Sequence, residues 1–157
     1  MKRKEREIRD FSAIVDVLRR CGTIRLGLRN GDFPYVVPVS FGLEVVDGKA
    51  VVYFHSTPAG LKAACLEKDA HVCVEADIFY KVEPTKIGIT ARYESVIGFG
   101  VAAPVEGEEK LHGLRTLVEH YGYDDYPLDR CRGLKNTVVY KVVLTELTGK
   151  RNLPGSD

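Results

Sequence analysis

The sequence predicts a mainly β fold in a single domain over residues 1–157, an antiparallel barrel of six strands with about three helices outside it. Three observations predict this fold. Six segments have the apolar patterning of strands, and the tight-turn signals Asn30-Gly31 and Asp47-Gly48 separate the first three of them. Three other segments carry apolar residues at helical spacing. A chain of 157 residues with 45% hydrophobic residues is long enough for one core.

Strands are expected where apolar residues alternate with polar ones, or where a short apolar run lies between turn signals. In the first strand Ile24, Leu26 and Leu28 are the apolar positions, which indicates that one face of the strand is buried. The final strand alternates in the same way from Val138 to Leu144. In chain order the six predicted strands are Thr23–Arg29, Phe33–Leu43, Ala50–His55, Ala70–Phe79, Tyr93–Ala103 and Thr137–Leu147.

Helices are expected where apolar residues recur every three or four positions. The first helix, Asp10–Cys21, is ended by Gly22. The second helix begins near Pro58, which suits a first helical turn, and runs to Lys68. The third helix, Glu108–Tyr121, carries an apolar stripe of four residues: Leu111, Leu114, Leu117 and Val118.

Composition and charge exclude several classes of function. The 23 basic and 22 acidic side chains leave a net charge of +1, so no binding to nucleic acid or to an acidic membrane surface is expected. No apolar run approaches the length of about 20 residues that a spanning helix needs. The charged start of the chain does not resemble a secretory signal, so a cytoplasmic protein with reduced cysteines is expected. The four cysteines and four histidines show no ligand spacing, so no metal site is expected.

Two pairs of residues bear on how the sheet contacts its surroundings. Pro34 and Pro38 are four residues apart in one strand, so both missing N–H donors face the same side. That side is either a plain edge of the sheet or a place where something other than a strand lies alongside. Gly98 and Gly100 share one face of their strand, which allows close approach of a flat ring or another backbone, or simply barrel curvature.

The segment that joins the third strand to the second helix is a candidate anion site. Free N–H groups and the helix dipole at the start of a helix favour a phosphate. His55, Ser56 and Thr57 add donors, and Lys62 adds a positive charge within about the first turn. The alternative is a capped helix start beside a solvated lysine.

The loop Tyr121–Arg132 has two readings. Its tyrosines are compatible with a lid over a ligand, or with side chains that pin the loop to the surface of its own domain. Arg130 and Arg132 are placed either to meet an anion or on a solvated face.

An ordered set of motifs resembles the nitroimidazole-resistance branch of the pyridoxamine 5'-phosphate oxidase-like flavoproteins. The resemblance extends from about Ile8 to Lys150, and each motif alone is weak, whereas their order is specific. The motifs are Arg25–Leu28, Pro34–Gly42, Tyr53–Ser56, Gly60 with Lys62, Ser95–Gly100 and Thr148–Lys150.

The resemblance implies a six-stranded FMN-binding split barrel that forms a homodimer, with FMN at the subunit interface. It implies that His55, Ser56 and Lys62 hold the phosphate, and that Tyr93 and Ser95 approach the cofactor from the partner subunit. It also implies that two strand segments line the flavin ring, partly through backbone groups: Arg25, Leu26, Gly27 and Leu28, and Val37, Pro38, Val39 and Ser40.

The function expected from this resemblance is that of an FMN-dependent oxidoreductase of the nitroreductase type, acting on a small molecule such as a nitro compound. The chain lacks the tryptophan-rich segment with which pyridoxamine phosphate oxidases proper grip their substrate, so salvage of vitamin B6 is not expected. The alternative is a non-enzymatic flavin- or haem-binding sensor on the same barrel. No catalytic side chain is assigned, since no paired carboxylates or Ser-His-Asp order stands out.

Overall fold

The computed structural model describes residues 3–86, 88–128, 131 and 133–154. Its helices are α1 (Phe11–Arg20), α2 (Leu61–Lys68) and α3 (Gly107–His120), with the 3-10 turns η1 (Lys4–Arg6) and η3 (Leu134–Asn136). Its strands are β1 (Glu7–Ile8), β2 (Ile24–Asn30), β3 (Phe33–Val39), β4 (Phe41–Val46), β5 (Lys49–Ser56), β6 (His71–Thr85), β7 (Gly88–Val105) and β8 (Val138–Asn152).

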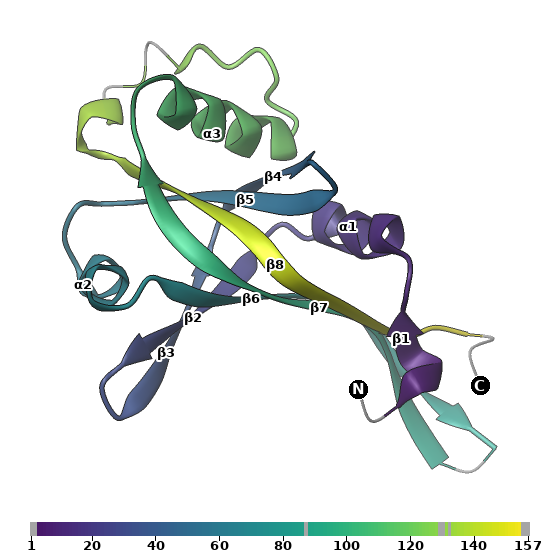
Figure 1. Ribbon diagram of the computed structural model, residues 1–157. Helices are drawn as coiled ribbons and strands as arrows, with labels where there is room; N and C mark the ends of the chain where they lie inside the picture. The colour runs from purple at the N-terminus through teal and green to yellow at the C-terminus, as the bar shows by residue number, and fades with distance from the viewer. Residues whose placement is uncertain (1–2, 87, 129–130, 132, 155–157) are drawn as a thin grey trace.

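All strands belong to one antiparallel sheet, in the order β3-β2-β6-β7-β8-β5-β4, with β1 paired to β8. The strands at its two ends, β3 and β4, are consecutive in the chain and are separated only by Ser40. The sheet therefore curls round until its two edges meet at Ser40 and stay apart elsewhere. This is a split barrel, with α3 along the top over β4 and β5 and the β6–β7 hairpin reaching away at the lower right (Figure 1).

The predicted fold class is confirmed, but the described residues form eight strands rather than six. The predicted strand Phe33–Leu43 is broken at Ser40, because the chain there leaves one edge of the sheet and starts the other. The second addition is the short β1, which pairs with Lys150 and Gly149 of β8. The turn Asp47-Gly48 forms as predicted, with φ of 50° and 72°, as a tight hairpin requires. The first turn lies one residue later than predicted, at Gly31 and Asp32, because Asn30 still pairs with Phe33.

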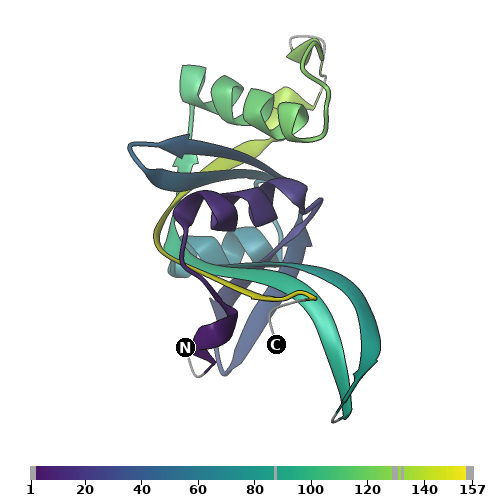
Figure 2. The same cartoon turned by 90° about the vertical axis from the view of Figure 1, so that its right-hand side faces the viewer.

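The β6–β7 hairpin is longer than the sequence predicted, since the prediction ended one strand at Phe79 and began the next at Tyr93. Beyond these points the hairpin leaves the barrel, as the view turned by 90° shows (Figure 2). In this part of the hairpin apolar side chains such as Val82 and Ile89 are exposed. The strand therefore has no buried face whose apolar alternation would predict it.

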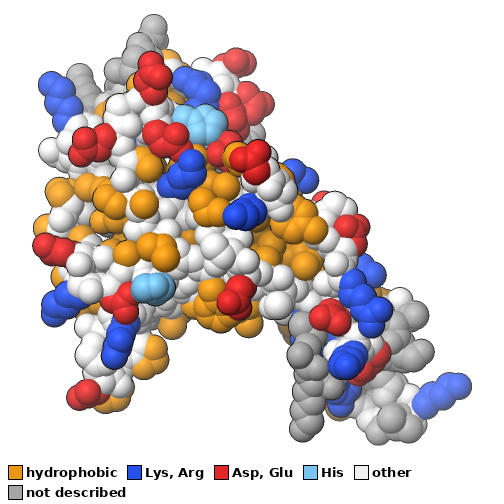
Figure 3. Space-filling model, in the orientation of Figure 1, with side chains coloured by type: hydrophobic (Ala, Val, Ile, Leu, Met, Phe, Trp, Pro, Cys, Tyr) orange, Lys and Arg blue, Asp and Glu red, His pale blue; other side chains and the backbone are white. Residues whose placement is uncertain are grey.

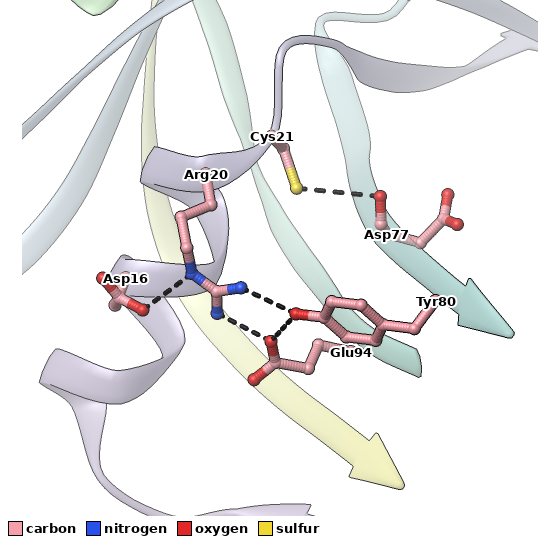
Figure 4. A network of polar contacts seen from close by, with 6 residues as sticks. All are labelled: Asp16, Arg20, Cys21, Asp77, Tyr80 and Glu94. Atoms are coloured by element: carbon pink, nitrogen blue, oxygen red, sulfur yellow. Dashed lines mark hydrogen bonds and ion pairs between the residues drawn. The ribbon is translucent and has the colours of Figure 1, made fainter. Parts of the chain in front are cut away.

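A polar network fastens α1 to the base of this hairpin (Figure 4). The Arg20 guanidinium donates to the Glu94 carboxylate at 2.7 Å and to the Tyr80 hydroxyl at 2.9 Å. The Tyr80 hydroxyl itself donates to Glu94 at 2.7 Å, and Asp16 accepts a further bond from Arg20 at 2.9 Å. Because Glu94 is only 5% exposed, these donors compensate the burial of its charge.

The helices differ from prediction in detail. Helix α1 begins as predicted, since the Asp10 side chain accepts from the Ser12 N–H and caps it. Helix α2 begins at Leu61, three residues after Pro58, because Gly60 turns the chain. In α3 the buried residues are Gly113 and Thr116 rather than the predicted leucine stripe. Gly113 lets the helix lie close to Tyr53 of β5, and Thr116 lies against Gly42 of β4.

The core fills the barrel between α1 and the inner faces of the strands, with Leu26, Phe41 and Phe54 each fully buried. Gly98 and Gly100 face inward, and a Cβ on Gly100 would lie 2.5 Å from the Val143 carbonyl oxygen. The register of β7 against β8 shifts between Phe99 and Gly100. The two glycines therefore make room for the backbone and side chains of β8 inside the barrel. No helix in the described part of the chain is long and apolar enough to cross a membrane.

Candidate functional site

A pocket of about 340 Å³ opens where the end of β5 meets the start of α2. We call it the α2 cradle. Its wall on one side is β3, and its floor is the turn between β5 and α2. The α2 cradle is lined by Tyr35, Val37, His55, Ser56, Thr57, Ala59, Gly60, Leu61 and Lys62.

The backbone of the α2 cradle leaves helix donors unsatisfied. Gly60 has a φ of 119°, which residues with a side chain rarely adopt, and it turns the chain sharply into α2. No side chain caps the helix, so the first N–H groups of α2 lack a side-chain acceptor. Since Gly60, Leu61 and Lys62 line the pocket, the positive end of the helix dipole lies at this site.

Lys62 brings a positive charge to the α2 cradle. Its Nζ donates to the carbonyl oxygen of His55 at 3.1 Å and lies 5.7 Å from the centre of the Phe54 ring. Burial lowers the pKa of Lys62 from its ordinary value, because the ammonium group has lost part of its hydration. A bound anion would restore favourable interactions to this half-buried cation.

His55 is the second titratable group in the α2 cradle. Its pKa is lowered, first by partial burial and then by the neighbouring charge of Lys62, which favours the neutral imidazole near pH 7. Beside it, Ser56 is buried, and the Thr57 hydroxyl donates to the Ala59 carbonyl at 2.7 Å. His55, Ser56 and Lys62, which the sequence predicted as one site, thus line one pocket.

The other predicted residues divide between two faces of the sheet. Leu26, Leu28 and Val39 are buried in the core, so only their backbone atoms are available to a ligand. Val37 lines the α2 cradle, and Ser40 is exposed at the junction of β3 and β4.

The outer face of the sheet carries the remaining predicted residues of β2 and β3. Arg25 lies opposite Pro38 on β3 and opposite Glu75 on β6, and its guanidinium pairs with Glu75 at 2.9 Å and with Asp77. Gly27 lies opposite Cys73, whose Cβ is 3.3 Å from where a Gly27 Cβ would be.

The two prolines lie on an edge strand, because β3 pairs with β2 alone among the described strands. Pro34 and Pro38 lie opposite Arg29 and Arg25, and the ladder continues past both. Their missing donors therefore fall on the open side of the sheet, where no strand competes for backbone hydrogen bonds.

Tyr93 and Ser95 lie on β7, on the same outer face as Arg25, and do not line the α2 cradle of their own chain. Lys150 places its Nζ 5.9 Å from the centre of the Tyr93 ring. The same face continues into three exposed apolar residues, Ile97, Phe99 and Val101.

Sequence reasoning missed Tyr35, Ala59 and Leu61 as lining residues of the α2 cradle. Tyr35 could have been predicted, because side chains two residues apart in a strand lie on the same face, and Tyr35 is two residues before Val37 in β3. Ala59 and Leu61 depend on the path of the turn, which only the position of Gly60 fixes.

The loop after α3 is pinned to its own domain at its start. The Tyr121 hydroxyl donates to the Gly22 carbonyl at 2.8 Å and accepts from the Phe41 N–H at 3.2 Å. Tyr123 and Tyr126 are exposed. Arg130 and Arg132 lie outside the described residues.

Comparison with known proteins gives one family and several related structures. The family model described as pyridoxamine 5'-phosphate oxidase matches residues 10–151. A candidate 5-nitroimidazole antibiotic resistance protein from Bacteroides thetaiotaomicron is 28% identical with a TM-score of 0.81, over 92% of this chain and 85% of that chain. No curated protein matches the sequence.

Two further structures share the fold at lower identity. The FAD and haem binding protein from Mycobacterium smegmatis has a TM-score of 0.78 at 17% identity, over 94% of this chain and 73% of that chain. A flavocytochrome from Azotobacter vinelandii has a TM-score of 0.74 at 19% identity, over 94% of this chain and 69% of that chain.

Proposed function

The chain belongs to the pyridoxamine 5'-phosphate oxidase family, and on that premise we propose that it is a flavoprotein which binds FMN and reduces a small molecule such as a nitro compound. The observation that carries the proposal is the α2 cradle. It joins an uncapped helix start, a half-buried lysine and a histidine in one pocket. The resemblance to a candidate nitroimidazole-resistance protein supports the choice of substrate class.

The residues of the α2 cradle fit a phosphate group. The uncapped start of α2 leaves backbone N–H donors available for such an anion, and a side chain at Gly60 would strain that turn. Lys62 supplies the charge, and a protonated His55 supplies a further donor. The carboxylates that line other parts of the sheet, such as Glu75, are absent from the lining of this pocket.

The wall of the α2 cradle that β3 forms would receive the flavin ring. A bound flavin supplies the two-electron redox chemistry, which the protein's own side chains lack. The open edge of β3 leaves backbone groups free to orient the polar edge of such a ring. Val37 offers it an apolar surface.

The proposal includes a homodimer in which Tyr93 and Ser95 of one chain approach the flavin of the other. The exposed apolar side chains of β7, from Ile97 to Val101, support it, since a large apolar patch favours association. Figure 3 shows hydrophobic side chains gathered across the middle of the face on which β7 and β8 cross in Figure 1.

Turnover of a nitro compound distinguishes an enzyme from a flavin-binding sensor. Protein loaded with FMN is mixed with NADH or NADPH and a nitroimidazole, and the loss of nitro absorbance is followed. We expect flavin-dependent reduction of the nitro compound. Bound flavin without turnover across a panel of nitro compounds would favour a sensor, and a Soret band in the purified protein would favour a haem protein.

A further inference from the structure

The end of the β6–β7 hairpin projects from the barrel as an arm. We call the part beyond the opposed pair Phe79 and Tyr93 the β6–β7 arm, which comprises residues 80–85 of β6 and 88–92 of β7. Figures 1 and 2 show that it extends away from the rest of the sheet. Among its described side chains only that of Arg92 is buried, so the arm packs little of its surface against its own chain.

An extra residue bends the chain where the β6–β7 arm begins. Phe79 lies opposite Tyr93 and Lys81 lies opposite Arg92, so Tyr80 has no counterpart among the described residues of β7. A bulge of this kind bends its strand and increases the local twist. The direction of the arm is therefore set at Tyr80.

Polar contacts on both sides of the bulge hold the arm in this direction. The Tyr80 hydroxyl accepts from Arg20 of α1 at 2.9 Å and donates to Glu94 at 2.7 Å, which ties the bulge to α1 (Figure 4). Beyond the bulge, the Arg92 guanidinium donates to the side chain of Asn152, at the end of β8, at 3.1 Å. Because Arg92 and Asn152 are both buried, this second contact is shielded from water. The arm is thus fixed relative to the barrel.

One face of β7 carries a largely apolar row from the tip of the arm to the middle of the barrel. Side chains alternate between the two faces of a strand, so every second residue belongs to the row. Ile89 is 77% exposed, and Val82, which lies opposite Ala91 on the neighbouring strand, is 58% exposed. Apolar side chains kept in water on a fixed element are typical of a surface that another protein covers. The row consists of Ile89, Ala91, Tyr93, Ser95, Ile97 and Phe99.

We infer that the β6–β7 arm packs against the partner subunit of the proposed dimer, beside the flavin that Tyr93 and Ser95 approach, an inference that rests on the proposed function. The occupant of the exposed face of the arm is a second copy of this chain, because the row continues into the exposed patch from Ile97 to Val101 that supports the dimer. An arm that begins at Tyr93 covers the partner surface next to the one that Tyr93 meets.

Tyr80 is a positioning residue in this arrangement. Its hydroxyl acts through the bulge, which it fastens to Arg20 and Glu94, and so fixes where the arm and the neighbouring Tyr93 meet the partner. Loss of this hydroxyl should therefore disturb the dimer and the flavin site together.

Ile89→Asp tests the contact, because Ile89 is exposed near the tip of the arm. Each dimer contains the arm twice, so we expect the dimer Kd, measured by sedimentation without flavin, to rise by at least about tenfold. The affinity for FMN should fall at low protein concentration and recover at concentrations above the new dimer Kd, whereas a purely structural defect would not recover. Val46→Asp, at an exposed position at the end of β4, is the matched control and should dimerise as the wild-type protein does.

Tyr80→Phe tests the positioning, since it removes the hydroxyl and keeps the ring. We expect the dimer Kd to rise by about two- to tenfold, the effect of one lost hydrogen bond, with the same concentration-dependent loss of FMN affinity. Tyr126→Phe removes an exposed hydroxyl from the loop after α3 and should change neither quantity.

The outcomes separate the inference from the proposed function, because sedimentation reports on the arm without flavin. Wild-type protein that forms dimers and binds FMN, with unchanged dimerisation in Ile89→Asp, would overturn the inference and leave the proposed function intact. A dimer weakened by Ile89→Asp but not by Tyr80→Phe would overturn the role of Tyr80. A dimer that Ile89→Asp weakens but that binds no flavin would overturn the proposed function.

Discussion

At the scale of single residues the account depends on Lys62. Its ammonium group is held near the start of α2 by the His55 carbonyl and by the Phe54 ring. A lysine fixed in this way is already positioned for an anion, so little side-chain entropy is lost on binding. Its lowered pKa marks a charge that has given up part of its hydration without gaining an acidic partner among the residues that the structure describes.

Replacing Lys62 should weaken flavin binding strongly. A hydrogen bond to a charged group contributes about 1.5–3 kcal/mol, so Lys62→Met should raise the Kd for FMN by about 10- to 100-fold. Lys68→Met is the matched control, because Lys68 is exposed in the last turn of the same helix and does not line the α2 cradle. Calorimetry on both variants checks this, and equal affinities would contradict the assignment of Lys62.

His55 should make flavin binding depend on pH. In the free protein its lowered pKa keeps the imidazole neutral near pH 7. A bound phosphate favours the protonated form, so binding takes up a proton and the affinity should rise as the pH falls from about 8 to about 6.5.

The variant His55→Gln should bind FMN more weakly and show a flatter pH profile than the wild-type protein. The phosphate of FMN has its own second pKa near 6, but it affects both proteins equally, so the difference between the profiles reports His55. Calorimetry in buffers of different ionisation heat measures the proton uptake directly. Full FMN affinity with lost turnover would instead give His55 a role in the reaction.

At the scale of elements, sequence patterns predicted the helices and strands that bury one face and expose the other. The helix Phe11–Arg20 and the alternating first half of β6 follow from apolar spacing alone. The break at Ser40 was not predictable in this way, because Val39 and Phe41 are both apolar and buried on either side of it. Where the chain changes edges is set by closure of the whole sheet, which local patterns do not contain.

The candidate site also has one part that the sequence predicted and one part that it did not. The motif around His55 and Lys62 was readable, because a strand end followed by a helix start is a local arrangement. A neighbouring pocket of about 510 Å³ was not readable, since Ala102, Tyr140 and Glu67, which line it, come from three separate elements. Only the packing of α2 beside β7 and β8 brings these residues together.

The packing of α3 against β4 can be tested by one substitution in β4. A Cβ on Gly42 would lie 2.5 Å from the backbone nitrogen of Leu117 in α3, so Gly42→Ala must push the helix away. We expect a loss of about 1–3 kcal/mol in the free energy of unfolding. Gly22→Ala, where no atom lies within 4 Å of the added Cβ, should change it by less than about 0.5 kcal/mol. Urea denaturation measures both, and equal effects would show that α3 is loosely seated.

At the scale of the whole molecule the proposal requires two chains. Phe99→Asp places a charge in the exposed apolar patch on β7, where Phe99 is 48% exposed, and should convert the dimer to a monomer and release flavin. Val46→Asp, at an exposed position at the end of β4, is the control and should leave both unchanged. Sedimentation at several concentrations checks the mass. A wild-type monomer that keeps tight FMN would contradict the shared site.

The whole account rests on a flavin phosphate in the α2 cradle. The most direct measurement is the absorbance spectrum of the purified protein, followed by calorimetric titration with FMN after removal of any bound flavin. We expect a yellow protein that binds one FMN per chain and loses that binding with Lys62→Met. Colourless protein that produces no heat with FMN would contradict the central claim.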